Sequence, residues 1–330
     1  MAVNGVKIVF GTGSDSHVFD DVPGWLDILD ELSIKNIDTA EAYDTWEEQL
    51  GLAGAASRGF ILDTKILSGM NPSPATKDLV IKSGKESLRK LKTESVDVYY
   101  IHSPDRRVSW RETLSGLDEL YKQGAFKRLG LSNFLGREVD EIVQVAKDNG
   151  FVVPSVYQGN YSAIARRTEE ELFPVLRKHN MAFYAYSPLA GSFLAKSEGS
   201  LFAPNSRFAQ TDFTGALYNG MYNKPSYISA LTVWGKISES EGISRAELAY
   251  RWIVYHSKLQ AELGDAVIVG ARKQQQLRDA MAAIKKGPLS DGAVEGIEAI
   301  WATVKDDAAL DNMEVASTIA DKLQKGSGQA

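Results

Sequence analysis

Four residues with acid–base chemistry stand at the ends of apolar, strand-like runs. Asp38 closes one such run, and Tyr43 follows it five residues later. Lys65 and His102 close the next two runs along the chain. A tyrosine hydroxyl is a poor acid at neutral pH, with an unperturbed pKa of about 10, but a nearby ammonium lowers that pKa and a carboxylate holds the ammonium in place. If the four side chains meet, they form a set that donates a proton to a carbonyl group receiving hydride, while His102 orients the substrate oxygen or shares its proton.

Each of the four residues also has an ordinary structural explanation. Asp38 could cap a turn, and Lys65 could be a solvated strand end. Tyr43 could pack in the core, and His102 could be a histidine that only satisfies a hydrogen bond. Their convergence in one cleft is what favours chemistry. A second chemistry stays open here, in which Lys65 is the Schiff-base nucleophile of a barrel aldolase.

The elements that would position these side chains alternate along the chain. Short β-rich apolar runs are separated by helical patterns, which is typical of parallel strands covered by helices. The eight predicted strands cover residues 6–10, 36–38, 60–64, 96–101, 126–131, 155–158, 182–186 and 266–269. Eight strand–helix units predict a (β/α)8 TIM barrel of the α/β class, in which residues at the strand ends converge at one mouth. A doubly wound sheet is the structural alternative.

We expect a single barrel domain over residues 1–330, with residues 325–330 frayed, because no linker or low-complexity tract interrupts the chain. Residues 190–225 are rich in glycine and aromatic side chains and predict a long irregular loop after the seventh strand, of the kind that covers a ligand. Helix starts are expected at three capping boxes and one Ser-Pro pair: Ser109 to Glu112, Thr168 to Glu171, Ser244 to Glu247, and Ser73-Pro74.

Several blocks of sequence resemble one known family. The string NIDTAEAY at residues 36–43 resembles the aldo-keto reductase signature near the second strand. Further blocks match the family in its own order: Thr64-Lys65, VDVYYIH at 96–102, GLSN at 130–133, YSPL at 186–189 and VIVG at 267–270. Within the family, FYAYSPLAG at 183–191 and Gln276-Leu277 make the chain most similar to the aflatoxin-aldehyde-reductase-like branch.

The resemblance implies a barrel enzyme that reduces an aldehyde or ketone to an alcohol with NADPH. It implies Tyr43 as the general acid, Lys65 and Asp38 as the groups that tune it, and His102 as the group that orients the carbonyl. It also implies a set of cofactor-binding residues before the last strand: Gly11, Thr12, Ser132, Asn133, Gln158, Tyr186, Ser187, Leu189, Gly191 and Ser192. Of these, the residues at positions 132, 133 and 158 match those that hold the nicotinamide carboxamide. Position 186 matches the aromatic ring on which the nicotinamide stacks, although core packing alone would also explain a tyrosine there.

A second phosphate-type site is predicted after the last strand. Gly270 is followed by Arg272 and Lys273 at the expected start of a helix, with Gln276 in its first turn. A helix N-terminus favours anions, and barrels often bind phosphate after strands 7 and 8. The two cations are therefore candidate ligands of an adenosine 2′-phosphate, although they could also be solvated surface charges. The family often has Asn where this chain has Ala280, which leaves the contact with adenine open.

The turn after the candidate acid also departs from the family. Asp44 follows Tyr43 where glycine is common in the family. The change leaves the acid itself in place. It adds a charge near the mouth of the predicted barrel.

Composition limits the partners. The 330 residues include 37 Lys and Arg against 43 Asp and Glu, a formal net charge of −6, which is a poor match to nucleic acid or to an anionic membrane surface. The absence of cysteine excludes disulfides and thiolate metal sites, and no pair of histidines has ligand spacing, so no metal is expected. The first residues lack a signal-peptide pattern, which predicts a cytoplasmic protein.

One short segment bears on the choice of substrate. Residues 218–222, YNGMY, contain no arginine where the branch has arginines suited to small anionic aldehydes. We therefore expect a small-molecule carbonyl substrate that is larger than those aldehydes, neutral and partly aromatic. A non-enzymatic nucleotide-binding regulatory subunit, resembling the potassium-channel β-subunits, is the main alternative function. The oligomeric state is left open, a homodimer included.

Overall fold

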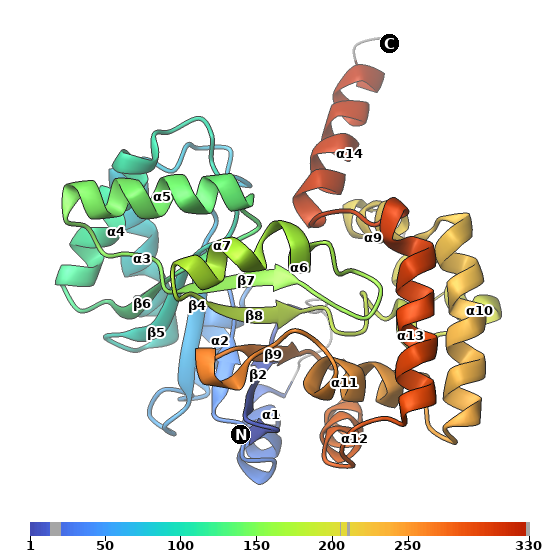
Figure 1. Ribbon diagram of the computed structural model, residues 1–330. Coiled ribbons are helices and arrows are strands. Elements are labelled where there is room, and N and C mark those ends of the chain that lie inside the picture. The colour runs from blue at the N-terminus through green and yellow to red at the C-terminus, as the bar shows by residue number, and fades with distance from the viewer. Residues whose placement is uncertain (14–20, 205, 210–211, 328–330) are drawn as a thin grey trace. The chain divides into compact units, whose positions relative to one another are not determined.

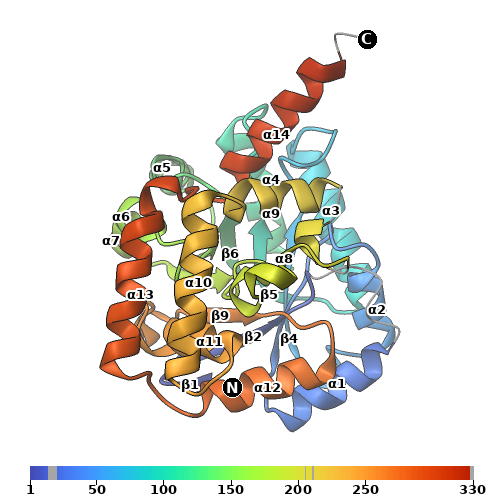
Figure 2. The same cartoon turned by 90° about the vertical axis from the view of Figure 1, so that its right-hand side faces the viewer.

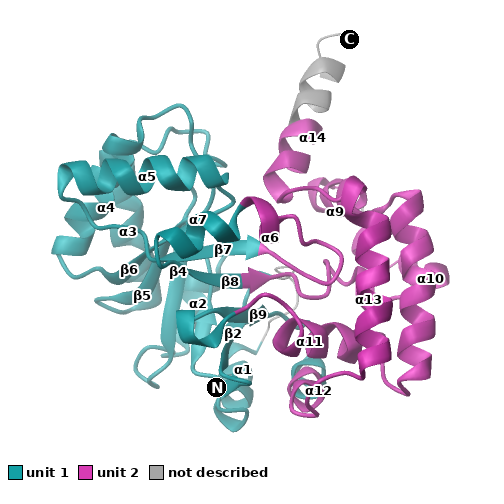
Figure 3. Ribbon diagram, in the orientation of Figure 1, with its two compact units in different colours: residues 1–159, 172–184, 260–279 teal, residues 160–171, 185–259, 280–330 magenta. Residues whose placement is uncertain are grey.

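The computed structural model describes residues 1–13, 21–204, 206–209 and 212–327. The chain divides into two compact units, coloured separately in Figure 3. Unit 1 comprises residues 1–159, 172–184 and 260–279, and unit 2 comprises residues 160–171, 185–259 and 280–330. Each unit is built from segments that are distant in sequence. The expectation of a single domain stays a prediction.

The strands form one closed sheet. In chain order they are β1 (Ala2–Val3), β2 (Val6–Gly11), β3 (Asn36–Asp38), β4 (Ile61–Ile66), β5 (Val96–Ile101), β6 (Phe126–Ser132), β7 (Val156–Asn160), β8 (Ala182–Tyr186) and β9 (Ala266–Val269). Each strand pairs with the next, and β2 pairs in parallel with both β3 and β9. This closure makes an eight-stranded parallel barrel, and it confirms the predicted TIM barrel over a doubly wound sheet. The short β1 adds an antiparallel pairing to β2 that the sequence analysis missed.

Burial on both faces explains why most strands are continuous apolar runs in the amino-acid sequence. Every residue of β3, β7 and β9 is buried, because one face of each strand fills the barrel and the other is covered by helices. The helices of unit 1 are α1 (Val22–Glu31), α2 (Trp46–Leu52), α3 (Lys77–Leu91), α4 (Trp110–Lys122), α5 (Gly136–Asn149), α7 (Phe173–Lys178) and the first part of α12 (Gln274–Ile284). Figure 1 shows α3, α4 and α5 beside one another along β4 to β6.

Two of the four predicted helix caps are confirmed. Ser109 caps α4, and Ser244 caps α11 (Arg245–Tyr255), because each hydroxyl accepts a backbone N–H three residues on. The Ser73 prediction is wrong, since Thr76 caps α3 instead. A helix does begin at Thr168, namely α6 (Thr168–Glu171), but the predicted capping box is not formed, because the buried Thr168 hydroxyl has no hydrogen-bond partner within the described ranges.

Unit 2 is largely helical. Besides α6 and α11 it contains α8 (Glu198–Leu201), α9 (Phe213–Tyr222), α10 (Pro225–Ser240), α13 (Asp291–Val304) and α14 (Asn312–Ser327), and the 3₁₀ turns η2 (Phe193–Ala195), η3 (Arg207–Ala209) and η5 (Lys305–Asp307). The turn η4 (Ala261–Leu263) belongs to unit 1. Helices α10 and α13 run side by side in Figures 1 and 2. In the described ranges, no helix is long and apolar enough to cross a membrane.

Residues 190–225 do not form the irregular aromatic loop that was predicted. The segment contains η2, α8, η3 and α9, so much of it is helical. Phe193 packs against Phe208 and Tyr222, with ring centroids 5.7 Å apart in both pairs, and Tyr222 packs against Tyr227. These four side chains are buried and form a core for unit 2. Burial of aromatic surface, which the local glycine-rich sequence did not reveal, is what orders the segment.

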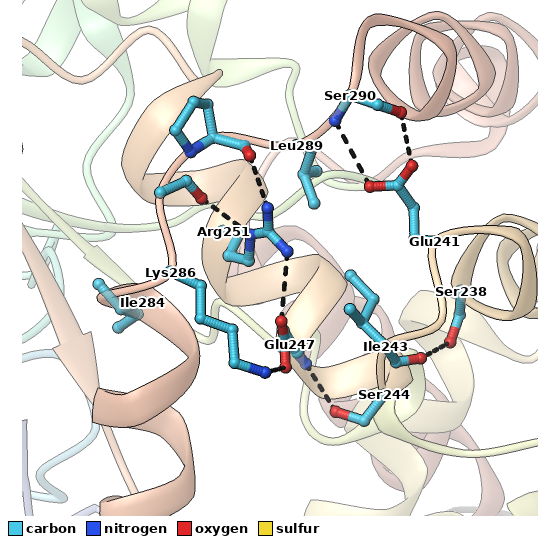
Figure 4. Close-up of polar contacts among 12 residues, drawn as sticks. Ser238, Glu241, Ile243, Ser244, Glu247, Arg251, Ile284, Lys286, Leu289 and Ser290 are labelled. Atoms are coloured by element: carbon cyan, nitrogen blue, oxygen red, sulfur yellow. Dashed lines mark hydrogen bonds and ion pairs between the residues drawn. The ribbon is translucent and has the colours of Figure 1, made fainter.

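A polar cluster fastens α11 to the chain segment that precedes α13 (Figure 4). The Glu247 carboxylate accepts from Lys286 Nζ at 2.8 Å and from Arg251 Nη1 at 3.2 Å. Arg251 also donates to the carbonyl oxygens of Gly287 and Pro288. We call Glu247, Arg251 and Lys286 the α11 ion cluster. Its members join two elements of unit 2 that lie far apart in sequence.

Candidate active site

Two of the predicted residues form an ion pair inside the barrel. Lys65 Nζ donates to Asp38 Oδ2 at 2.6 Å and to the Thr39 carbonyl oxygen at 2.8 Å. Lys65 has no exposed surface, and Asp38 is 3% exposed. Asp38 is the last residue of β3, and Lys65 lies within β4. Adjacent parallel strands therefore hold both side chains against each other.

The ion pair is held from a third strand. Gln158 on β7 donates from Nε2 to Asp38 Oδ1 at 2.8 Å. Each carboxylate oxygen of Asp38 therefore has its own donor. Gln158 was expected only as a ligand of the nicotinamide carboxamide, and its contact with Asp38 was not foreseen.

Lys65 is a cation at neutral pH. Burial by itself lowers the pKa of the Lys65 ammonium, but the charges of Asp38 and Tyr43 and the hydrogen bond to Asp38 outweigh burial and raise the pKa above its usual value. A protonated lysine has no lone pair for nucleophilic attack. The barrel thus contains a fixed positive charge at this point.

Tyr43 lies beside this charge. The centre of its ring is 4.9 Å from Lys65 Nζ, and it meets the His102 ring edge-on with centroids 5.6 Å apart. The chain turns sharply here, because Asp44 has a left-handed φ of 50°. Gly13 lies so close to the Tyr43 ring that a Cβ at that position would be 2.9 Å from Cζ. The structure thus brings the four predicted acid–base residues together, and we call them the acid–base cluster.

His102 is neutral at physiological pH. Burial, and then the charge of Lys65, lower the pKa of its imidazole to about 3. Its Nδ1 is buried and has no hydrogen-bond partner among the described residues. Its backbone carbonyl accepts from Asn133 Nδ2 at 2.9 Å, which ties the end of β5 to the end of β6. A neutral imidazole can donate one hydrogen bond to a neighbouring oxygen atom.

The other predicted residues of unit 1 surround this cluster. Asn133 has a left-handed φ of 63°, and its amide also donates to Ser132 Oγ at 3.0 Å. Thr12 follows Gly11, the last residue of β2, and its backbone N–H donates to the Asp38 carbonyl oxygen at 2.9 Å. The Thr12 hydroxyl is 3.0 Å from the Thr39 hydroxyl. These contacts connect the ends of β2, β3 and β6 to the acid–base cluster.

The predicted phosphate site is a capped helix N-terminus. The Gln276 side-chain oxygen accepts from the backbone N–H of Arg272 at 3.0 Å and of Lys273 at 3.1 Å. Gly270 precedes this turn and is exposed, as is Lys273, while Arg272 is partly buried. The two N–H groups and the two cations belong to one turn. The two N–H groups already donate to Gln276, so the two cations are the donors in this turn that suit a phosphate group.

The remaining predicted cofactor residues lie in unit 2, at the end of β8 and just after it. Ser187, Gly191 and Ser192 have left-handed φ angles of 57°, 66° and 81°, so the chain folds into a tight series of turns that includes Leu189. Tyr186 is the last residue of β8 and is partly buried. These residues form a second group, separate from the unit 1 residues in the division of the chain.

Unit 2 also contains an arginine that bears on the choice of substrate. The Arg207 guanidinium lies 5.2 Å from the centre of the Tyr218 ring and donates to the Tyr218 hydroxyl at 3.3 Å. Residues 218–222 themselves contain no arginine. The fold brings one there from eleven residues earlier in the chain.

Three contributors to the site were missed. Thr39 supplies the carbonyl that accepts from Lys65, and Gly13 makes room for the Tyr43 ring. Asp63 is fully buried two residues before Lys65 on the same strand. The two-residue alternation of a strand places Asp63 and Lys65 on one face, so this signal was available in the sequence. No group of three or more His, Cys, Asp or Glu side chains in the described ranges could hold a metal ion.

Comparison with known proteins agrees with this arrangement. The chain is 40% identical over 286 residues to oxidoreductase sirO of Leptosphaeria maculans, covering 86% of each chain. It is 35% identical over 279 residues to human aflatoxin B1 aldehyde reductase member 4, covering 80% of this chain and 84% of that one. An aldo-keto reductase of Pseudocercospora fijiensis is 34% identical over 288 residues, covering 85% of this chain and 97% of that one.

The family model described as "Aldo/keto reductase family" matches residues 7–302. The predicted resemblance, including that to the aflatoxin-aldehyde-reductase-like branch, is therefore confirmed. Because the match spans β2 to β9 and continues through most of α13, the chain belongs to the aldo/keto reductase family of oxidoreductases, which act on small carbonyl compounds.

Proposed function

We propose that this protein reduces an aldehyde or ketone to an alcohol with NADPH, and that Tyr43 donates the proton. The proposal rests on one observation above all. Lys65 Nζ is paired with Asp38 at 2.6 Å and lies 4.9 Å from the centre of the Tyr43 ring. A fixed ammonium beside a phenol favours the phenolate and so makes the phenol a better acid.

The reaction needs one hydride and one proton. When the carbonyl carbon accepts hydride, its oxygen becomes an alkoxide and takes the proton from the Tyr43 hydroxyl. Lys65 stabilises the phenolate that remains. Asp38 holds Lys65 charged and in place, and Gln158 holds Asp38. The neutral His102 ring donates a hydrogen bond to the substrate oxygen and keeps it facing Tyr43.

The residues present suit a reduced nicotinamide dinucleotide phosphate, which supplies the hydride when bound. The exposed turn at the start of α12 offers the donor set for a 2′-phosphate in Arg272 and Lys273. Around the acid–base cluster, the polar side chains proposed to hold the carboxamide are Ser132, Asn133 and Gln158, with Gly11 and Thr12 at the end of β2. In unit 2, Tyr186 would stack on the nicotinamide, and Ser187, Leu189, Gly191 and Ser192 would line the pyrophosphate.

The aldolase alternative is less well supported. A Schiff-base nucleophile must be an unprotonated amine with room to reach a carbonyl carbon. Lys65 is charged, is fully buried, and has two acceptors within 2.8 Å. Its geometry suits a charge that stays in place during the reaction.

The substrate is proposed to be a small carbonyl compound. The aromatic surface of unit 2 favours a neutral, partly aromatic molecule, and Phe202 and Phe213 are 49% and 52% exposed. Arg207 beside Tyr218 supports a carboxylate-bearing aldehyde instead. The first assay should therefore compare aromatic aldehydes and dicarbonyls with acid semialdehydes, and loss of NADPH absorbance measures turnover.

The decisive variant is Tyr43→Phe. Loss of a positioned general acid lowers the rate by about 10²- to 10⁴-fold. Tyr121→Phe is the matched control, because Tyr121 loses the same hydroxyl at a site that is 41% exposed on α4. NADPH binding, measured by fluorescence, should be kept in both variants. Near-normal reduction by Tyr43→Phe would show that another group supplies the proton.

A further inference from the structure

A third carboxyl group lies in the barrel interior, next to the acid–base cluster. Asp63 pairs in register with Asp38 on the adjacent strand, and it precedes Lys65 by two residues on its own strand. Both relations place it on the inner face of the barrel. The Asp63 side chain has no exposed surface.

The cations around Asp63 are already paired with other acids. Lys65 pairs with Asp38 at 2.6 Å, and Arg128 on β6 pairs with Asp97 at 2.7 Å. Within the described ranges, no ion pair reaches Asp63.

In the part of the chain that the structure describes, the Asp63 carboxyl group has a single hydrogen bond. Its Oδ1 accepts from the Val98 backbone N–H at 3.0 Å, and its Oδ2 is buried without a partner among the described residues. The nearby Tyr100 hydroxyl is likewise buried without a described partner, and the Tyr100 ring lies 5.7 Å from Lys65 Nζ. A carboxylate taken out of water without a cation is costly, whereas the protonated acid is not.

We propose that Asp63 is a positioning residue of the acid–base cluster: it is kept as a neutral carboxylic acid at neutral pH, so that Asp38 alone sets the field on Lys65 and Tyr43. This inference rests on the proposed role of Tyr43. Burial, followed by the charges of Asp38 and Asp97, raises the pKa of Asp63 to about 8, against weaker opposition from the Val98 N–H and Arg128. As pH rises above this value, a new negative charge next to Lys65 opposes ionisation of Tyr43 and keeps the phenol protonated.

Asp63→Asn tests this inference, because it keeps the acceptor for Val98 and removes the ionisable group. Glu47→Gln is the matched control: Glu47 is also a buried carboxyl, and it accepts from Thr64, the neighbour of Asp63 on β4, whose side chain points to the other face. Ionisation of Tyr43 is measured directly as the ultraviolet difference between each protein and its Tyr43→Phe counterpart. We expect Asp63→Asn to move this ionisation down by about 0.5–1 pH unit and Glu47→Gln to leave it in place.

The alkaline limb of carbonyl reduction should move in the same direction in Asp63→Asn. An unchanged ionisation of Tyr43 in this variant overturns the inference, whatever the activity. A shifted ionisation together with no reduction of any carbonyl compound supports the inference and overturns the proposed function instead. If Asp63→Asn does not fold, Asp97→Asn is the deciding variant. Loss of the Asp97 charge leaves Arg128 to favour the ionised form of Asp63. The pH at which Tyr43 ionises should then rise. No change, or a downward change, in Asp97→Asn would then overturn the inference.

Discussion

Two buried carboxylates of this protein hold a lysine in contrasting surroundings. In the barrel, Lys65 meets Asp38 at 2.6 Å, and the two side chains are 0% and 4% exposed. In the α11 ion cluster, Lys286 meets Glu247 at 2.8 Å, and the side chains are 56% and 9% exposed. The distances are nearly equal, but the lysine is sealed from water in one case and solvated in the other.

The two clusters also differ in how completely their polar groups are used. Arg251 donates hydrogen bonds to Glu247 and to two backbone carbonyls, as Figure 4 shows. In the barrel, His102 Nδ1 and Asp63 Oδ2 have no partner among the described residues. Groups left unsatisfied in a dry interior are costly unless something else meets them. The α11 ion cluster fastens α11 to the segment before α13, whereas the barrel interior contains polar atoms that no described residue satisfies.

Removing the lysine from each cluster should give the largest contrast. Lys65→Met leaves Asp38 buried without its cation, which costs about 3–5 kcal/mol of unfolding free energy, and it lowers carbonyl reduction at least about 100-fold. Lys286→Met should cost about 1 kcal/mol or less, because Glu247 keeps Arg251. Urea denaturation and NADPH oxidation measure the two effects. Equal destabilisation by the two variants would contradict the contrast.

The Lys65 effect can be sharpened with a second change. Asp38→Asn removes the carboxylate that Lys65→Met leaves unpaired. The double variant should therefore regain part of the lost stability but none of the activity. Stability that falls further in the double variant would show that Asp38 contributes through packing rather than charge.

His102 in the barrel and His256 beside the α11 ion cluster should contribute differently to the pH dependence of the protein's stability. The pKa of His102 is about 3 in the folded protein and about 6.5 in the unfolded chain, so between these values the unfolded chain binds more protons. Stability is therefore lost as pH falls from about 6.5 towards 3. His102→Asn should flatten this loss. His256→Asn should flatten this loss less. The pKa of the His256 imidazole is also lowered by burial and by the charge of Arg251, but His256 is less buried than His102. Urea midpoints at several pH values measure both slopes, and parallel slopes for wild type and His102→Asn would contradict a buried neutral imidazole.

A smaller effect is expected for cofactor choice. Arg272→Ala should raise the Michaelis constant for NADPH several-fold and leave that for NADH nearly unchanged, because it removes charge-assisted hydrogen bonds to a 2′-phosphate. Arg251→Ala is the comparison, since Arg251 is engaged within the α11 ion cluster. Initial rates with both cofactors test this. An unaltered preference in Arg272→Ala would place phosphate recognition elsewhere.

The smallest effect concerns backbone strain in two turns. Asp44 has a φ of 50° beside Tyr43, and Asp44→Gly should change the unfolding free energy by only a few tenths of a kcal/mol, because relief of strain is offset by a more flexible unfolded chain. Gly242, with a φ of 65° between α10 and α11, meets nothing within 4 Å. Gly242→Ala should therefore cost about 1 kcal/mol from strain alone. Thermal melts of both variants measure the two changes in stability. If Asp44→Gly changed the melting temperature more than Gly242→Ala, local packing would outweigh backbone strain.

The barrel was predictable because its strands are both buried and short. The predicted bounds of 36–38, 96–101, 182–186 and 266–269 are those of β3, β5, β8 and β9. Strands buried on both faces leave an apolar run that local sequence records. The prediction for residues 190–225 was wrong for the opposite reason. The side chains that order this segment, such as Phe193 and Tyr227, meet only after the chain has folded back.

The sequence by itself determined the candidate chemistry. Asp38, Lys65 and His102 occur where barrel strands end, and a parallel barrel brings such positions to one mouth regardless of the details of packing. Tyr43 follows on the adjoining turn, so its arrival near Lys65 was also expected.

Only the tertiary structure decided which groups pair. Gln158 bonds Asp38, Gln276 caps the turn containing Arg272, and Asp63 is left without a cation. Spacing along the chain says which face a side chain occupies, but the strength of an ion pair or hydrogen bond depends on distance and on the exclusion of water. Those two quantities are set by register between strands that are remote in sequence, and they exist only in the closed barrel.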